Sequence, residues 1–172
     1  MAFEIPAGLH PRLLPIAWMV GRWEGAGTVE HPSMPVHRFH QVLQVEQDGR
    51  PFLTYTSHTW VPDDASRDRA PDATETGYLR VVPSDQEAPR TVELEMVVAH
   101  PTGVVEVYTG TGGEGKVELS TDLVARTATG PDYTAGKRLI GLVGGDFMWA
   151  YDMAGYGYPL TSYASAHLKR GS

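Results

Sequence analysis

The chain has 172 residues, of which 41% are hydrophobic and 20% charged, a balance that predicts a single folded domain over residues 1–172. Its formal net charge is -7, so we expect its surface to repel nucleic-acid phosphates and anionic membranes. It contains no cysteine, which excludes disulfides, thiolate nucleophiles and cysteine-based zinc or iron–sulfur sites.

The first third of the chain predicts a short helix followed by strands. Residues 10–20 carry apolar side chains at helical spacing behind Pro11, which indicates one or two helical turns. The strands expected next, from their Val, Thr, Tyr and Leu content, cover residues 23–30, 36–47 and 51–60. Asp48-Gly49 predicts a hairpin turn between the last two of them. Alternation along the third strand makes His58 a candidate for a position facing a cavity.

The rest of the chain predicts a series of short strands. Residues 61–74 are polar and contain two prolines, so a loop is expected there. Further strands are predicted over residues 75–82, 91–100, 103–109, 116–121, 123–127, 137–143 and 147–153. Many short strands joined by short turns favour an all-β, antiparallel meander, and closing it into a barrel would remove its exposed edges.

Residues 21–27 form the pattern GxWxGxG, made by Gly21, Trp23, Gly25 and Gly27. Its spacing differs from that of a dinucleotide-binding loop, and no β–α–β unit follows it. We therefore predict a structural role, in which Trp23 on the first strand plugs the floor of the barrel.

Further motifs flank GxWxGxG in a fixed order. LPIAWMV at 14–20 precedes it, and it is followed by HPSMP at 31–35, GRPFLTY at 49–55, TGYLR at 76–80, AHPTG at 99–103, EV at 106–107, MA at 153–154 and GYPL at 157–160. Taken together, the series resembles the nitrobindin family over nearly the whole chain.

The resemblance implies a closed antiparallel β-barrel of about ten strands with a short helical segment near the N-terminus, similar to fatty-acid-binding proteins and lipocalins. It implies a cavity that holds haem b, mostly ferric, with a histidine on the last strand as the iron ligand. Nitric oxide binding and isomerisation of peroxynitrite to nitrate are the activities attributed to the family. Some members form dimers, so a homodimer is one partnership that the resemblance implies.

This chain departs from the family at the ligand position. Where the family pattern resembles G-x-P-L-x-x-H-L, Tyr163 stands in place of the histidine. On the other side of the expected pocket, Asp72-Ala73 stands where typical members have a Met-His or Leu-His pair. Ser33 keeps the small hydroxyl residue that the family places after a proline, so Ser33 and Tyr163 are cofactor-binding candidates by family position.

Tyr163 has two interpretations. A phenolate ligates ferric haem in catalases, but the ordinary pKa of tyrosine is near 10, so the metal or a cation must stabilise the anion. Alternatively, Tyr163 fills the cavity and hydrogen-bonds across it. His167 is a second candidate ligand, because a strand period of two would place it on the face of Tyr163. On a strand the two lie roughly 13 Å apart, too far to share one iron position, whereas a helix would place them one turn apart.

Two functions from different classes follow. In the first, a nitrobindin-like barrel has lost the usual haem binding and binds a small apolar or amphipathic molecule. In the second, a ferric haem b protein acts on peroxynitrite or nitric oxide as a peroxynitrite isomerase, with Tyr163 or His167 as ligand. A weaker third hypothesis is an interaction protein that uses the barrel as a scaffold.

Other sites and the cellular location have simpler predictions. The histidines form no close metal-ligand pattern, so no metal site is predicted and surface positions are expected for most of them. The strand carboxylates Glu75, Glu93 and Glu95 are expected to be solvated or to line the barrel. The first residues lack a basic start with a long apolar run, and no apolar stretch approaches the roughly 18 residues of a membrane span, which predicts a cytoplasmic protein.

Overall fold

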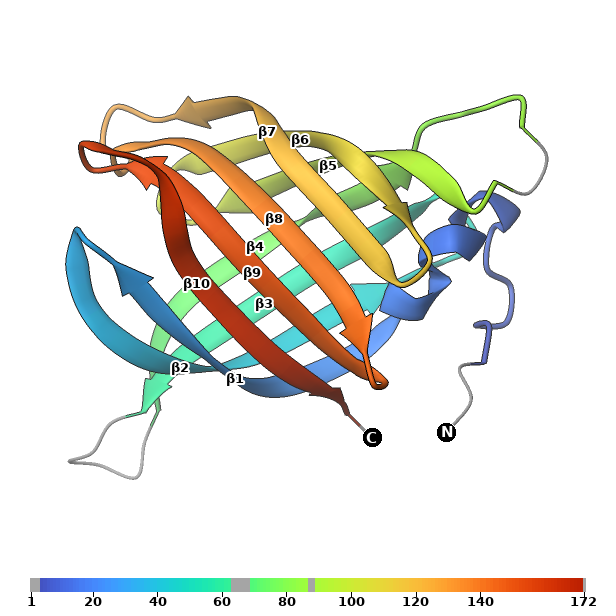
Figure 1. The fold of residues 1–172 in the computed structure, drawn as a ribbon, viewed down its shortest axis with the longest axis horizontal. Coiled ribbons are helices and arrows are strands. Elements are labelled where there is room, and N and C mark those ends of the chain that lie inside the picture. The colour runs from blue at the N-terminus through green and yellow to red at the C-terminus, as the bar shows by residue number, and fades with distance from the viewer. Residues whose placement is uncertain (1–3, 63–68, 87–88, 172) are drawn as a thin grey trace.

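The structure, a computed structural model, describes residues 4–62, 69–86 and 89–171 and forms one closed β-barrel (Figure 1). Each strand pairs antiparallel with its neighbours in the chain, and β1 also pairs with β10, which closes the ladder. The strands are β1 (Gly21–His31), β2 (Met34–Glu46), β3 (Phe52–Pro62), β4 (Arg69–Val81), β5 (Thr91–His100), β6 (Val104–Gly113), β7 (Lys116–Arg126), β8 (Tyr133–Val143), β9 (Asp146–Gly155) and β10 (Tyr158–Arg170).

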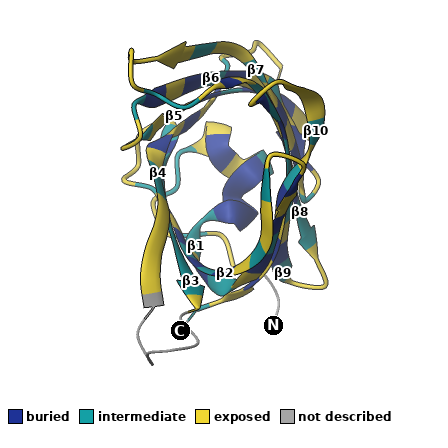
Figure 2. Ribbon diagram, turned by 90° about the vertical axis from the view of Figure 1, so that its left-hand side faces the viewer, coloured by how far each residue is buried: buried dark blue, intermediate teal, exposed yellow. Residues whose placement is uncertain are grey.

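A 3₁₀ helix, η1 (Pro11–Met19), precedes the barrel and closes one of its ends. Pro11 supplies a φ suited to the first helical turn, and the His10 side chain accepts a hydrogen bond from the backbone N–H of Arg12. The view into the barrel in Figure 2 shows η1 across the far end, with its buried face inside the ring of strands. Within the described residues, no helix is both long and apolar enough to cross a bilayer.

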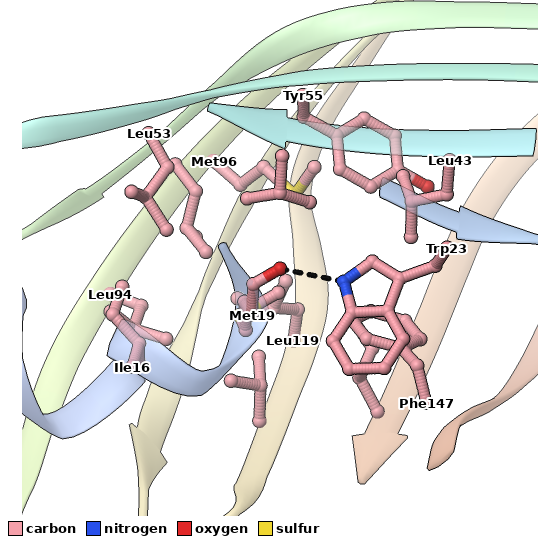
Figure 3. Packing of buried hydrophobic residues seen from close by; sticks show 14 of the residues in the cluster. Ile16, Met19, Trp23, Leu43, Leu53, Tyr55, Leu94, Met96, Leu119 and Phe147 are labelled. Atoms are coloured by element: carbon pink, nitrogen blue, oxygen red, sulfur yellow. Dashed lines mark hydrogen bonds between the residues drawn. The ribbon is translucent and has the colours of Figure 1, made fainter. Parts of the chain in front are cut away.

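Trp23 joins η1 to the barrel wall. Its side chain is fully buried, and its indole Nε1 donates a hydrogen bond to the backbone carbonyl of Met19 at 2.9 Å (Figure 3). Its ring packs against Phe147 with centroids 5.2 Å apart, and the guanidinium of Arg170 lies 4.1 Å from its ring centroid. Trp23 therefore has the structural position that the GxWxGxG pattern predicts.

The glycines of the pattern allow β1 to approach its neighbours closely. A Cβ atom on Gly25 would collide with the backbone carbonyl of His167 on β10. A Cβ atom on Gly27 would collide with the ring of Phe39 on β2 and with the carbonyl of Ser165 on β10. The motif thus serves barrel closure, because β1 is the strand that pairs with both β2 and β10.

The predicted fold class is confirmed, and several element bounds need correction. The segment 61–74 is largely strand, because β3 runs to Pro62 and β4 starts at Arg69, with Val61 opposite Ala70; residues 63–68 lie outside the described part of the chain. The strands predicted over 116–121 and 123–127 are one strand, β7, with a register shift at this point opposite β6. The strand predicted from residue 137 begins earlier, at Tyr133.

Candidate functional site

A cavity of about 270 Å³ lies at the end of the barrel opposite η1. Turns at this end contribute Pro101, Thr102, Pro131 and Tyr156 to its mouth. Its walls are rich in aromatic side chains, namely Phe39, Tyr55, Tyr133, Phe147, Trp149, Tyr151 and Tyr163. Its polar lining comprises Gln41, Ser57, Thr59, Asp72, Thr74, Glu75, His100 and Arg138. A concave, mostly apolar pocket with a few convergent polar groups is the usual form of a small-molecule site.

Tyr163 lines this cavity because β10 is irregular at this residue. Ser162 pairs with Asp152 and Ala164 pairs with Tyr151, so Tyr163 is an extra residue opposite one step of β9. Such a bulge interrupts the alternation of faces, and both Tyr163 and Ala164 consequently line the cavity. The ring of Tyr163 lies edge-on to the ring of Tyr151, with centroids 5.5 Å apart.

The same bulge places His167 on the outer face of the barrel. Beyond Tyr163 the buried positions of β10 are Ala164, Ala166 and Leu168, so the residues between them face outward. His167 is exposed, and its Nε2 atom lies 2.6 Å from a carboxylate oxygen of Asp146 on β9. The expectation that strand alternation brings His167 to the face of Tyr163 is therefore wrong, because the bulge shifts that alternation by one residue.

Ser33 lies in the turn between β1 and β2 and is not among the residues that line the cavity. Its hydroxyl oxygen is 2.6 Å from Nδ1 of His31, and its backbone N–H donates to the same nitrogen. His31 is buried, and its Nε2 atom has no hydrogen-bond partner within the described part of the chain. Its ring lies edge-on to that of Tyr163, with centroids 5.8 Å apart, so His31 links Ser33 to the cavity wall.

Asp72 and Ala73, which replace the family's second pocket pair, line the cavity on β4. The hydroxyl of Thr59 donates to Asp72 Oδ2 at 3.0 Å, and the backbone N–H of Ala73 donates to the Thr59 oxygen at 2.9 Å. The sequence departures at Tyr163 and Asp72-Ala73 therefore face one cavity.

His58 faces away from this cavity. Leu53, Tyr55 and Ser57 are the buried residues of β3, so the alternating positions, including His58, point outward. Its Nδ1 atom lies 3.2 Å from the hydroxyl of Thr74. The cavity position considered for His58 is therefore wrong.

A network of charged and phenolic groups forms the wall behind the cavity. Its centre is Glu106 on β6, which is fully buried. Its carboxylate accepts hydrogen bonds from His100 at 2.6 Å, from Arg138 at 3.1 Å, and from the hydroxyls of Tyr108 and Tyr133. The hydroxyl of Tyr151 is 3.2 Å from the same carboxylate.

Arg138 links this network to the cavity. Its two terminal nitrogens donate to the carboxylate oxygens of Glu75 at 2.8 and 3.0 Å, and its Nε donates to Tyr108 Oη at 2.9 Å. Burial alone would lower the pKa of Arg138, but the carboxylates of Glu75 and Glu106 outweigh it and raise that pKa well above its ordinary value. The guanidinium is therefore permanently charged and oriented by two carboxylates.

The carboxylate and the two buried phenols at the centre of the network have pKa values far from neutral pH. Burial would raise the pKa of Glu106, but the Arg138 charge and the hydrogen bonds from His100, Tyr108 and Tyr133 lower it to about 2. Burial raises the pKa of Tyr108 to about 12, and burial also raises the pKa of Tyr133. A general acid or base works best with a pKa near the operating pH, so these groups orient one another and the cavity wall instead.

A second, smaller set of hydrogen bonds orients the apolar wall. Gln41 on β2 donates to the Ser57 hydroxyl at 2.8 Å and accepts from the indole Nε1 of Trp149 at 2.8 Å. Trp149 in turn stacks on Phe39 with ring centroids 6.0 Å apart. These contacts fix the aromatic surface that a bound molecule would meet.

From the sequence, no site role is predicted for Glu106, Arg138 or the tyrosines around them, and His100 is expected at the surface. The sequence of β6 did contain a signal. Val104, Glu106 and Tyr108 alternate along one face of this strand, and Val104 and Tyr108 are hydrophobic residues of the kind found in a core. A carboxylate on a core face requires charged and hydrogen-bonding partners. Those partners come from β5, β8 and β9, so no local motif identifies them.

Residues 12–170 match the family model described as the THAP4-like, heme-binding β-barrel domain. The chain therefore belongs to this family, the nitrobindins. It is 52% identical over 180 residues to a ferric nitrobindin-like protein of Kineococcus radiotolerans, with 100% of both chains covered. It is 42% identical over 170 residues to a peroxynitrite isomerase of Nocardioides sp., with 99% of both chains covered.

The nitrobindin fold is also supported by a solved structure. The crystal structure of Rv2717c from M. tuberculosis superposes with a TM-score of 0.82 at 30% identity, covering 95% of this chain and 99% of that chain. The family and fold implied by the ordered motifs are thus confirmed. One of these relatives is described as a ferric nitrobindin-like protein and the other as a peroxynitrite isomerase, so the function of this nitrobindin has to be inferred from its own residues.

Proposed function

We propose that this nitrobindin barrel does not hold haem through the family's iron-ligand position and instead binds a small molecule in its cavity. The observation that carries the proposal is the environment of Tyr163. Burial, and then the negative charges of Asp72 and Glu75, raise the pKa of its phenol to about 12. A haem ligand at this position would have to be a phenolate, and these surroundings oppose its formation.

The dimensions of the cavity support the same conclusion. Its volume of about 270 Å³ is below the roughly 300–1,000 Å³ typical of pockets for drug-sized ligands. Haem is larger than such ligands, so side chains of the cavity wall would have to move to admit it. Trp149 is held by Gln41, and Tyr151 is held by the hydroxyl of Tyr133 at 2.6 Å. The residues present therefore do not fit haem in the family's manner.

The alternative function is a ferric haem protein ligated by Tyr163 that acts on peroxynitrite. One observation favours it: the Tyr163 side chain does line the cavity, on the strand where the family places its ligand. Relatives such as the Nocardioides protein are described as peroxynitrite isomerases. This alternative requires the iron itself to stabilise the phenolate.

Absorption spectroscopy separates the two functions. Ferric haem is titrated into the wild-type protein, Tyr163→Phe and Tyr163→His. We expect no tight, specific Soret band for wild type or Tyr163→Phe, and a gain of binding for Tyr163→His, because neutral imidazole needs no stabilised anion. A tight wild-type band that Tyr163→Phe abolishes would refute the proposal and establish the alternative.

A further inference from the structure

The cationic group that lines the cavity is already occupied by protein acceptors. All three nitrogens of the Arg138 guanidinium donate hydrogen bonds, to Glu75, Glu106 and Tyr108. These four hydrogen bonds leave one N–H of the guanidinium, on the nitrogen that donates once to Glu75. A ligand carboxylate that accepted two parallel hydrogen bonds would therefore have to displace Glu75, Glu106 or Tyr108, and loss of the Glu106 contact would leave a fully buried charge without this partner. The charge of Arg138 is thus already largely neutralised by carboxylates of the protein.

The charge that faces the cavity is negative. Asp72 lies at the exposed mouth, Glu75 lies deeper, and both line the cavity, while Glu106 is ionised behind the wall. The basic residues in the described lining are Arg138 and His100, and each already contacts Glu106. Carboxylates therefore outnumber cations around the cavity whichever protonation state His100 adopts. The same charges that oppose a phenolate at Tyr163 would oppose a carboxylate from a ligand.

The aromatic walls suit a cation. Tyr151, Tyr156, Tyr163, Trp149 and Phe39 line the cavity. The negative faces of aromatic rings attract ammonium and guanidinium groups within about 6 Å. One such contact already exists at this wall, because the guanidinium carbon of Arg138 lies 4.8 Å from the ring centroid of Tyr151.

We infer that the cavity selects a small organic cation, an amine with an apolar body, over a carboxylate of the same shape. Its ammonium group is placed beside Asp72 and the rings of Tyr156 and Tyr163, and its apolar body packs toward Phe39 and Trp149. This inference rests on the proposed function as a small-molecule binder and adds the chemical class of the ligand.

Three probes with one shared body test the inference by isothermal titration calorimetry at pH 7 and low salt. They are 4-phenylbutylamine, 4-phenylbutanol and 4-phenylbutyrate, which share a phenylalkyl body of similar length and end in an ammonium, a hydroxyl and a carboxylate group. We expect the amine to bind at least about tenfold more tightly than the carboxylate, with the alcohol between them, as unit charges a few ångströms apart require. Asp72→Asn should reduce the amine's affinity several-fold and leave that of the alcohol unchanged.

Asp122→Asn is the matched control, because Asp122 is exposed on β7 and does not line the cavity. An equal loss of amine affinity in this control would overturn the placement beside Asp72. Equal affinity for all three probes, or preference for the carboxylate, would overturn the cation inference and leave the proposal of a ligand cavity standing. Failure of all three probes to bind would overturn both.

Discussion

Replacement of Glu106 by glutamine tests whether the buried network stabilises the barrel as its geometry indicates. The carboxylate is fully buried and accepts hydrogen bonds from Arg138, His100 and two tyrosines. Its pKa is lowered from 4.5 to about 2, a difference that corresponds to a free energy of unfolding on the order of 3 kcal/mol. Breaking a buried ion pair by removing one partner commonly costs a similar roughly 3–5 kcal/mol.

The pH dependence of this contribution has a definite sign. Above a pH of about 4.5, Glu106 is ionised in both the folded and the unfolded chain, and its full contribution to stability is present. As the pH falls from there toward 2, the unfolded chain binds a proton that the folded protein does not, so the contribution is lost. The difference in free energy of unfolding between wild type and Glu106→Gln should therefore be roughly 1.4 kcal/mol smaller at pH 3.5 than at pH 7.

Urea denaturation of both proteins at several pH values between 3.5 and 7 measures this difference. Glu95→Gln is the matched control, because Glu95 pairs with Arg80 at 2.5 Å and its side chain is 39% exposed. Exposed pairs contribute about 1 kcal/mol or less, so the control should change little at any pH. A Glu106→Gln effect under about 1 kcal/mol at pH 7, or one of equal size at pH 3.5, would refute the reasoning.

Three further substitutions test the barrel wall. Gly25→Ala should lower the free energy of unfolding by at least about 2 kcal/mol, since the new methyl group would collide with the β10 backbone. Gly141→Ala is the matched control: the nearest atom to a Cβ at Gly141 is 3.8 Å away, so this substitution should change the free energy of unfolding by less than about 1 kcal/mol. Trp23→Phe should cost about 1–3 kcal/mol in a thermal or urea melt, through loss of the hydrogen bond to Met19 and of ring volume, and an unchanged melting temperature would contradict the role of Trp23. His167→Ala should leave the affinity of any cavity ligand within about twofold in calorimetry, as expected for a side chain on the outer face, and a tenfold loss would show that His167 reaches the cavity.

Local chemistry determined much of the architecture. Pro11 and the apolar residues behind it predicted η1, and Asp48-Gly49 predicted the turn between β2 and β3, where Gly49 has a φ of 85°. Alternating Val, Thr, Tyr and Leu predicted most of the strands, because a strand's preference for such residues is set within the strand itself. The prediction of a loop over 61–74 was wrong, because the strand ends at 61–62 and 69–74 are largely exposed and polar, a composition that strand ends can share with loops.

The sequence by itself also determined the family, through the order of its motifs, and located the two departures at Tyr163 and Asp72-Ala73. Only the tertiary structure decided which side chains face the cavity. A bulge of one residue in β10 keeps Tyr163 inside and turns His167 outside, and its position depends on the pairing with β9. The partners of Glu106 lie on other strands, so its network exists only after the barrel closes and brings them together.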